Sequence, residues 1–99
     1  NLVSAVRRQI GAGADVVKLY GDYRWRPGEG SRPTYSQAEI AAAVAAAHDA
    51  GRPVAVHANT AEAMRRASAA GVDVIEHGGE GDAATFALMA RNRTGLCPT

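Results

Sequence analysis

The chain has 99 residues, of which 46% are hydrophobic and 21% are charged, and its formal net charge at pH 7 is +1. This composition is typical of one small globular unit and argues against a disordered tail, a basic nucleic-acid-binding surface and, with a single cysteine, an internal disulfide. No apolar run approaches the roughly 20 residues that span a bilayer, so we expect a cytoplasmic protein that binds neither membranes nor nucleic acids.

A helix, a strand and a long loop are predicted in the first third of the chain. Apolar residues recur at helical spacing to about Ile10, and the glycines that follow end this pattern. Residues 15–20 (DVVKLY) are β-rich and bounded by glycines, which is typical of a buried parallel strand. Residues 21–35 contain prolines and glycines without any period, which predicts a loop.

The next helix and strand are well marked. Ser36 stands three residues before Glu39, a capping-box spacing that predicts a helix from this point to residue 50. Gly51 then provides the left-handed conformation that commonly follows a helix end. Residues 53–57 (PVAVH) are predicted as a strand.

The same order of helix and strand is repeated twice in the rest of the chain. Thr60 predicts the cap of a helix through residue 70, which is followed by a strand over residues 73–77 (DVIEH). Asp82 predicts the cap of a helix to about residue 92, with a last strand from residue 95. The segments AGADVVK, AGRPVAVH and AGVDVIEH share one pattern, which indicates a repeated βα unit.

Strands that alternate with helices predict an α/β fold with parallel strands and right-handed crossovers. Both an open doubly wound sheet and a (β/α)8 barrel satisfy this pattern. Because a complete barrel needs about 250 residues, four strands amount to about half of one. In that case the first and last strands are sheet edges, and either edge can pair with another copy of the chain.

Three polar side chains stand at or near the ends of predicted strands, namely Lys18, His57 and His77. α/β folds place their active sites at the carboxyl ends of the strands. Neighbouring strands are about 4.8 Å apart, which allows two imidazoles to reach one divalent ion; the structural alternative is two histidines that bond to backbone. Counted from the preceding glycine, Lys18 falls one residue earlier than the histidines, an offset that the sequence leaves unexplained.

Lys18 has several possible roles. Burial of an ammonium group costs several kcal/mol unless the group is paired or loses its proton. A neutral lysine can act as a Schiff-base nucleophile, or it can take up carbon dioxide to form a carbamate that behaves as a bridging carboxylate. Alternatively, Lys18 pairs with an acid such as Asp22 or Glu76.

The runs GADVVKLYGDYRW, GRPVAVHA and GVDVIEHG resemble the amidohydrolase superfamily, in its imidazolonepropionase-like and Xaa-Pro dipeptidase (prolidase)-like branch. The resemblance spans nearly the whole chain. It implies a (β/α)8 barrel of a metal-dependent hydrolase, in which residues 1–99 form about strands 4 to 7 of the catalytic domain and the flanking parts are absent.

The resemblance also implies a metal site. Lys18 is then a carboxylated bridge between two divalent ions, expected to be zinc, and His57 and His77 ligate one of them. Relatives that hold a single ion need no such bridge. The implied reaction is attack of a metal-activated hydroxide on an amide-type carbon. Relatives also use a His-x-His pair on the first strand and an Asp on the eighth, and these 99 residues contain neither, so the piece alone is expected to be inactive.

Substrate contacts are expected from Asn59, which takes the place of a tyrosine or histidine in dipeptidase-like relatives, and from Tyr20 and Arg24 near the predicted loop. The expected substrate is a small molecule or peptide with an amide or cyclic amide bond. Two other functions remain open: a half-barrel that serves as a binding or assembly module, and a Schiff-base lyase that uses Lys18.

Overall fold

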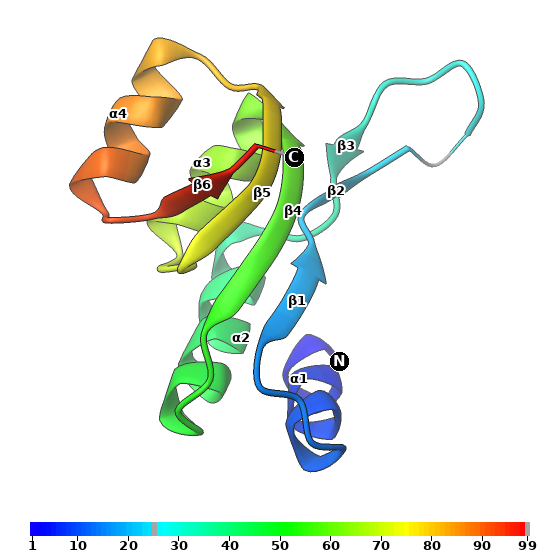
Figure 1. The fold of residues 1–99 in the computed structure, drawn as a ribbon. Helices are drawn as coiled ribbons and strands as arrows, with labels where there is room; N and C mark the ends of the chain where they lie inside the picture. Colours follow the sequence, from blue (N-terminus) through cyan, green and yellow to red (C-terminus); the bar gives the residue numbers. More distant parts are fainter. Residues whose placement is uncertain (25, 99) are drawn as a thin grey trace.

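The computed structural model describes residues 1–24 and 26–98 and is built around a four-stranded parallel sheet (Figure 1). The strand order is β1-β4-β5-β6, and every neighbouring pair is parallel, as the α/β prediction requires. The elements of the sheet and its helices are, in chain order, α1 (Leu2–Gly11), β1 (Val17–Tyr20), α2 (Gln37–Asp49), β4 (Val54–Thr60), α3 (Ala61–Ala69), β5 (Val74–Glu80), α4 (Ala83–Arg91) and β6 (Gly95–Cys97).

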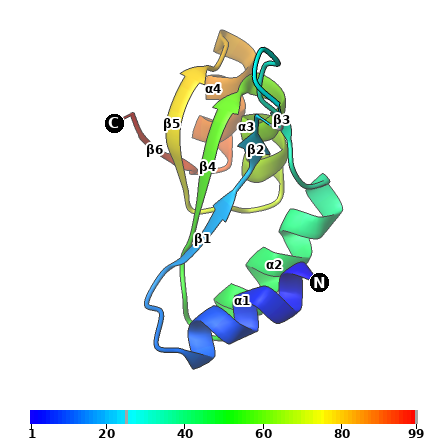
Figure 2. The same ribbon diagram turned by 90° about the vertical axis from the view of Figure 1, so that its right-hand side faces the viewer.

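The helices cover one face of this sheet, and the main core lies between the two layers (Figure 2). Alternate residues of a strand point to opposite faces, and on β4 the side chains of Val54, Val56 and Ala58 are buried in that core. His57 therefore belongs to the opposite face, which the helices leave uncovered. No helix among the described residues is long and apolar enough to cross a membrane.

Residues 21–35 differ from the prediction of a loop without regular structure. β2 (Asp22–Tyr23) and β3 (Arg32–Pro33) form a small antiparallel hairpin at the end of β1 (Figure 1). Two-residue strands are too short to produce a period in the sequence, which is why the pattern did not reveal them. The predicted loop also includes Trp25, which lies outside the described residues.

Two strands are longer than predicted. The sequence placed their ends at His57 and His77, whereas β4 runs to Thr60 and β5 to Glu80. Pairing between the two strands continues from Ala58 to Thr60 across a shift of register. The prediction that each histidine is the last residue of its strand was therefore wrong, because pairing with the neighbouring strand carries each strand further.

The three predicted helix caps are confirmed. Ser36 and Glu39 exchange both hydrogen bonds of a capping box, at 3.1 Å and 2.9 Å. The Thr60 hydroxyl accepts from the amide of Ala63 at 3.2 Å. The Asp82 carboxylate accepts from the amide of Thr85 at 2.8 Å. Local sequence signals thus correctly located the starts of α2, α3 and α4.

A carboxylate joins β4, β5 and α2 at the amino-terminal end of the sheet. Asp73 Oδ2 accepts a hydrogen bond from the Val54 amide at 2.7 Å. The same oxygen lies 2.7 Å from His48 Nε2. Partial burial raises the pKa of Asp73, but the hydrogen bonds from His48 and Val54 outweigh it, so this pKa lies below its ordinary value of 3.8. The folded state therefore prefers ionised Asp73.

We predict that Asp73→Ala in the complete protein lowers the free energy of unfolding by about 1–2 kcal/mol at pH 7, because two hydrogen bonds to a partly exposed carboxylate are lost. Since the pKa is lowered in the folded state, this contribution is present above about pH 3.8 and is lost as the pH falls through the folded value. Urea unfolding at pH 7 and in acid measures it. Asp49→Ala, at an exposed position of α2, is the control. Equal losses in the two variants would contradict this role for Asp73.

We also predict that Gly21→Ala destabilises the fold by about 1–3 kcal/mol through overpacking. A Cβ at Gly21 would lie 2.6 Å from Val56 Cγ1 and 3.2 Å from the carbonyl oxygen of His57. Gly30→Ala is the matched control, since a Cβ there meets nothing within 4 Å. Comparison of the two urea midpoints tests the prediction, which fails if Gly21→Ala unfolds no earlier than the control.

Candidate functional site

The two strand histidines meet on the uncovered face of the sheet. The ring centroids of His57 and His77 are 4.2 Å apart, and the rings are tilted by 62° in an edge-on arrangement. The Tyr20 ring lies beside them, with its centroid 5.3 Å from that of His57. The structure thus brings together two imidazoles from neighbouring strands, as the metal-site hypothesis requires.

His77 reaches this face through an unusual backbone conformation. In the ladder it is paired with Ala58, whose side chain points into the core, so regular alternation would direct His77 into the core as well. Instead His77 has φ 81° and Gly78 has φ 67°, and the imidazole contacts His57 on the other face. A positive φ is unfavourable for a residue with a side chain, and such outliers cluster at functional sites. The local turn therefore redirects the second histidine.

Lys18 lies on the same face, one alternation step before the level of His57. The register pairs Lys18 with Ala55 and Tyr20 with His57, and His57 in turn is paired with Glu76. In this register Lys18 lies two residues before the level of His57, which is more than the one-residue offset counted from the glycines in the sequence. Lys18 follows the alternation of β1, whereas His77 departs from that of β5.

The amine of Lys18 is engaged by a carboxylate. Lys18 Nζ is 2.8 Å from Glu76 Oε2, and the Lys18 side chain is 50% exposed. The hydrogen bond to Glu76 and its negative charge raise the pKa of Lys18, while the hydrogen bond from Lys18 lowers the pKa of Glu76. Of the two acids predicted as alternative partners, Glu76 is the one paired. Asp22 is not, because it is 3% exposed and accepts hydrogen bonds from backbone amides.

The predicted substrate-binding residues are only partly brought together. Tyr20 is 58% exposed and lies next to His57. The side-chain oxygen of Asn59 accepts a hydrogen bond from the Gly79 amide at 3.3 Å, so this part of Asn59 bonds to β5. Arg24 is exposed and directly follows β2, and among the described residues no hydrogen bond or ion pair joins it to the histidines.

The sequence predicts roles for Glu76 and Asp22 that differ from those in the structure. Glu76 was considered only as a partner for Lys18, although alternation along β5 places it on the face of His57. Asp22 was considered in the same role, whereas it holds the end of β4. Alternation along the strand that contains Glu76 is a usable signal for its face. The contacts of Asp22 join residues 37 and 38 positions apart, and no local pattern indicates them.

The residues on this face fit part of a divalent metal site. Two imidazoles in ring contact are nitrogen donors of the kind that zinc favours. Glu76 lies on the same face, but its carboxylate is paired with Lys18. The described residues contain no group of three or more histidine, cysteine, aspartate or glutamate side chains arranged to hold an ion. The pair therefore provides two donors of a shell that usually has four.

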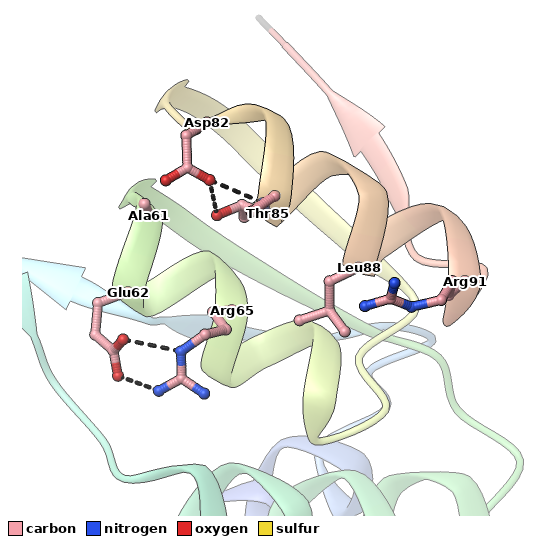
Figure 3. A pocket seen from close by; sticks show the side chains of 8 residues that line it. Ala61, Glu62, Arg65, Asp82, Thr85, Leu88 and Arg91 are labelled. Carbon is pink, nitrogen blue, oxygen red and sulfur yellow. Dashed lines mark hydrogen bonds and ion pairs between the residues drawn. The ribbon is translucent and has the colours of Figure 1, made fainter.

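A cavity of about 360 Å³ lies elsewhere, between α3 and α4 in the helix layer (Figure 3). Glu62 in its lining binds Arg65 and Arg66, and hydrogen bonds from these two arginines lower the pKa of Glu62 to about 2. Asp82 bonds to Thr85, as Figure 3 also shows. The lining consists of Ala61, Glu62, Arg65, Asp82, Ala84, Thr85, Leu88 and Arg91. Its lining contains no imidazole, and its one hydroxyl, that of Thr85, donates to Asp82, so the histidine face is the better candidate.

Comparison with solved structures places the fold among prolidase-like amidohydrolase barrels. A Xaa-Pro dipeptidase with bound methionine is 41% identical, with a TM-score of 0.87 over 98% of this chain and 24% of that chain. A prolidase in complex with N-methylphosphonate-L-proline is 34% identical, with a TM-score of 0.88 over 100% of this chain and 25% of that chain. The parallel β/α arrangement predicted as part of a (β/α)8 barrel is confirmed.

The sequence comparisons agree with this assignment. An uncharacterised protein of Mycobacterium tuberculosis is 37% identical over 98 residues, which are 99% of this chain and 26% of the relative. The chain thus spans about a quarter of the length of the relatives that it matches. The model of the amidohydrolase family matches residues 1–92. The chain belongs to the amidohydrolase family.

Proposed function

We propose that the complete protein is a metal-dependent hydrolase that cleaves an amide, peptide or cyclic amide bond, and that this chain supplies about strands 4 to 7 of its barrel. The observation that carries the proposal is the contact between the His57 and His77 rings, 4.2 Å apart between centroids, in a chain of the amidohydrolase family. Two similar structures contain methionine and a phosphonate analogue of a proline compound. These ligands support a small dipeptide-like substrate.

In this proposal His57 and His77 ligate one divalent ion through their imidazole nitrogens, and zinc is the ion that best suits such donors. When bound, such an ion lowers the pKa of water and polarises a carbonyl group, which is the chemistry that hydrolysis requires. Pairing between β4 and β5 holds the two imidazole rings next to each other, so both nitrogen donors are close together before an ion binds.

Lys18 is proposed as a carbamate that bridges two ions. Its neutral amine adds to the carbon of carbon dioxide, an N–C bond forms, and one proton is released, which leaves an anionic oxygen ligand. In the structure Lys18 is instead an ammonium group paired with Glu76 at 2.8 Å. Formation of the carbamate therefore requires this ion pair to open and the ammonium group to lose a proton before the amine adds to carbon dioxide.

Tyr20, Asn59 and Arg24 are proposed to contact the substrate. The Tyr20 ring is next to His57 and more than half exposed, so it can cover an apolar group at the site. An arginine such as Arg24 can bind the carboxylate of a peptide-like substrate through two hydrogen bonds. A small soluble substrate of this kind fits the proposed cytoplasmic location.

We predict that His57→Ala and His77→Ala each reduce the metal bound by the complete protein by one ion per chain or more. Each variant should also lower kcat/KM for dipeptide-like substrates by roughly 100-fold or more, because metal catalysis contributes several kcal/mol. Elemental analysis and kinetics measure both effects. His48→Ala is the matched control, since His48 pairs with Asp73 at the opposite end of the sheet. Native metal content in both site variants would contradict the proposal.

We predict that the complete protein, supplied with ¹³C-labelled bicarbonate, shows a carbamate resonance that is absent from Lys18→Ala. The variant should also bind about one divalent ion where the native protein binds two, because the bridge is lost. NMR and elemental analysis measure these properties. If no carbamate signal appears and metal content is unchanged, Lys18 is not a bridge. Trapping of a carbonyl substrate on Lys18 by borohydride would instead support the lyase alternative.

A further inference from the structure

Two residues outside the proposed ligand set tie together the strand ends that carry the histidines. Asp22 is 3% exposed, and its Oδ2 accepts hydrogen bonds from the backbone amides of Asn59 and Thr60, both at 2.7 Å. A buried carboxylate is costly unless it is bonded in this way, so both bonds are strongly favoured. Asp22 thereby anchors the backbone two residues beyond His57.

The residue just before this hairpin also holds the backbone of His57 itself. The amide of Gly21 donates to the carbonyl oxygen of His57 at 2.7 Å. The backbone of His57 to Asn59 is therefore bonded to Gly21 and Asp22 at both ends, with only Ala58 between the two attachments. This arrangement leaves little freedom in the peptide that carries the His57 imidazole.

Asn59 continues the connection to β5. Its side-chain oxygen accepts from the amide of Gly79 at 3.3 Å, two residues after His77. The φ of 81° at His77 is unfavourable and persists only where the surrounding structure holds it. The bond from Asn59 is a restraint on the turn that directs His77 toward His57.

We propose that Asp22 and Asn59 are positioning residues that hold the imidazoles of His57 and His77 in a common metal-binding geometry. This inference rests on the proposed function, in which both histidines bind one ion. Groups that orient metal ligands without touching the metal typically change metal affinity by about 10–100-fold when they are removed. In this role Asn59 acts through its oxygen, which accepts a hydrogen bond, and not through its NH₂ group.

The test measures the zinc Kd of the complete protein by competition with a chromogenic chelator. Asn59→Ala removes the acceptor and should weaken zinc binding by about 10-fold, whereas Asn59→Asp keeps an acceptor oxygen and should stay within about threefold of the native Kd or bind more tightly. Asn92→Ala is the matched control, because Asn92 also bonds across elements but to Ser68, away from the histidines. It should lower the unfolding midpoint and leave the Kd unchanged.

Asp22→Asn is the second variant, since it keeps the shape of the side chain but replaces the charged acceptor. It should weaken zinc binding by roughly 3- to 10-fold. Native affinity in both Asn59→Ala and Asp22→Asn overturns the inference, even if these variants unfold earlier. Loss of activity with native affinity in both Asn59 variants also overturns it, because Asn59 then acts on the substrate alone and not on the metal-binding geometry. If zinc binding survives His57→Ala as well, the proposed function itself fails.

Discussion

The candidate site depends on one backbone constraint, the left-handed conformation of His77. Lys18, His57 and Glu76 reach the uncovered face through the ordinary alternation of a strand. His77, by contrast, is paired with Ala58 and would otherwise point into the core. Its φ of 81° brings the ring to His57. Gly78 follows in a position where a Cβ would lie 2.8 Å from Leu96 Cδ1, so the residue after the turn must also be small. The strain and the contact between histidines are thus parts of one feature.

The two ends of the sheet perform different tasks. At the amino-terminal end, Asp73 joins β4 to α2 through the Val54 amide and His48, and this cluster stabilises the fold. At the carboxyl end, the buried carboxylate of Asp22 accepts hydrogen bonds from backbone amides at the end of the strand that carries His57. This division is the one expected of parallel β/α folds, in which chemistry collects where the strands end and stability is secured at the other side.

The ion pair between Lys18 and Glu76 is the contact that the proposed carbamate on Lys18 would replace. On a half-exposed surface the pair contributes little to stability, so it can be exchanged for other contacts at low cost. A carbamate on Lys18 would carry a negative charge and could no longer attract Glu76.

Local sequence by itself determined the repeated helices and strands, the caps at Ser36, Thr60 and Asp82, and the placement of polar residues near strand ends, because propensity, capping and periodicity act over a few residues. Only the tertiary structure decided that Lys18 pairs with Glu76. It also decided the hairpin, the buried bonds of Asp22 and the turn at His77. These features depend on strand register and on contacts between residues tens of positions apart. A local sequence pattern does not indicate which distant group a side chain will contact.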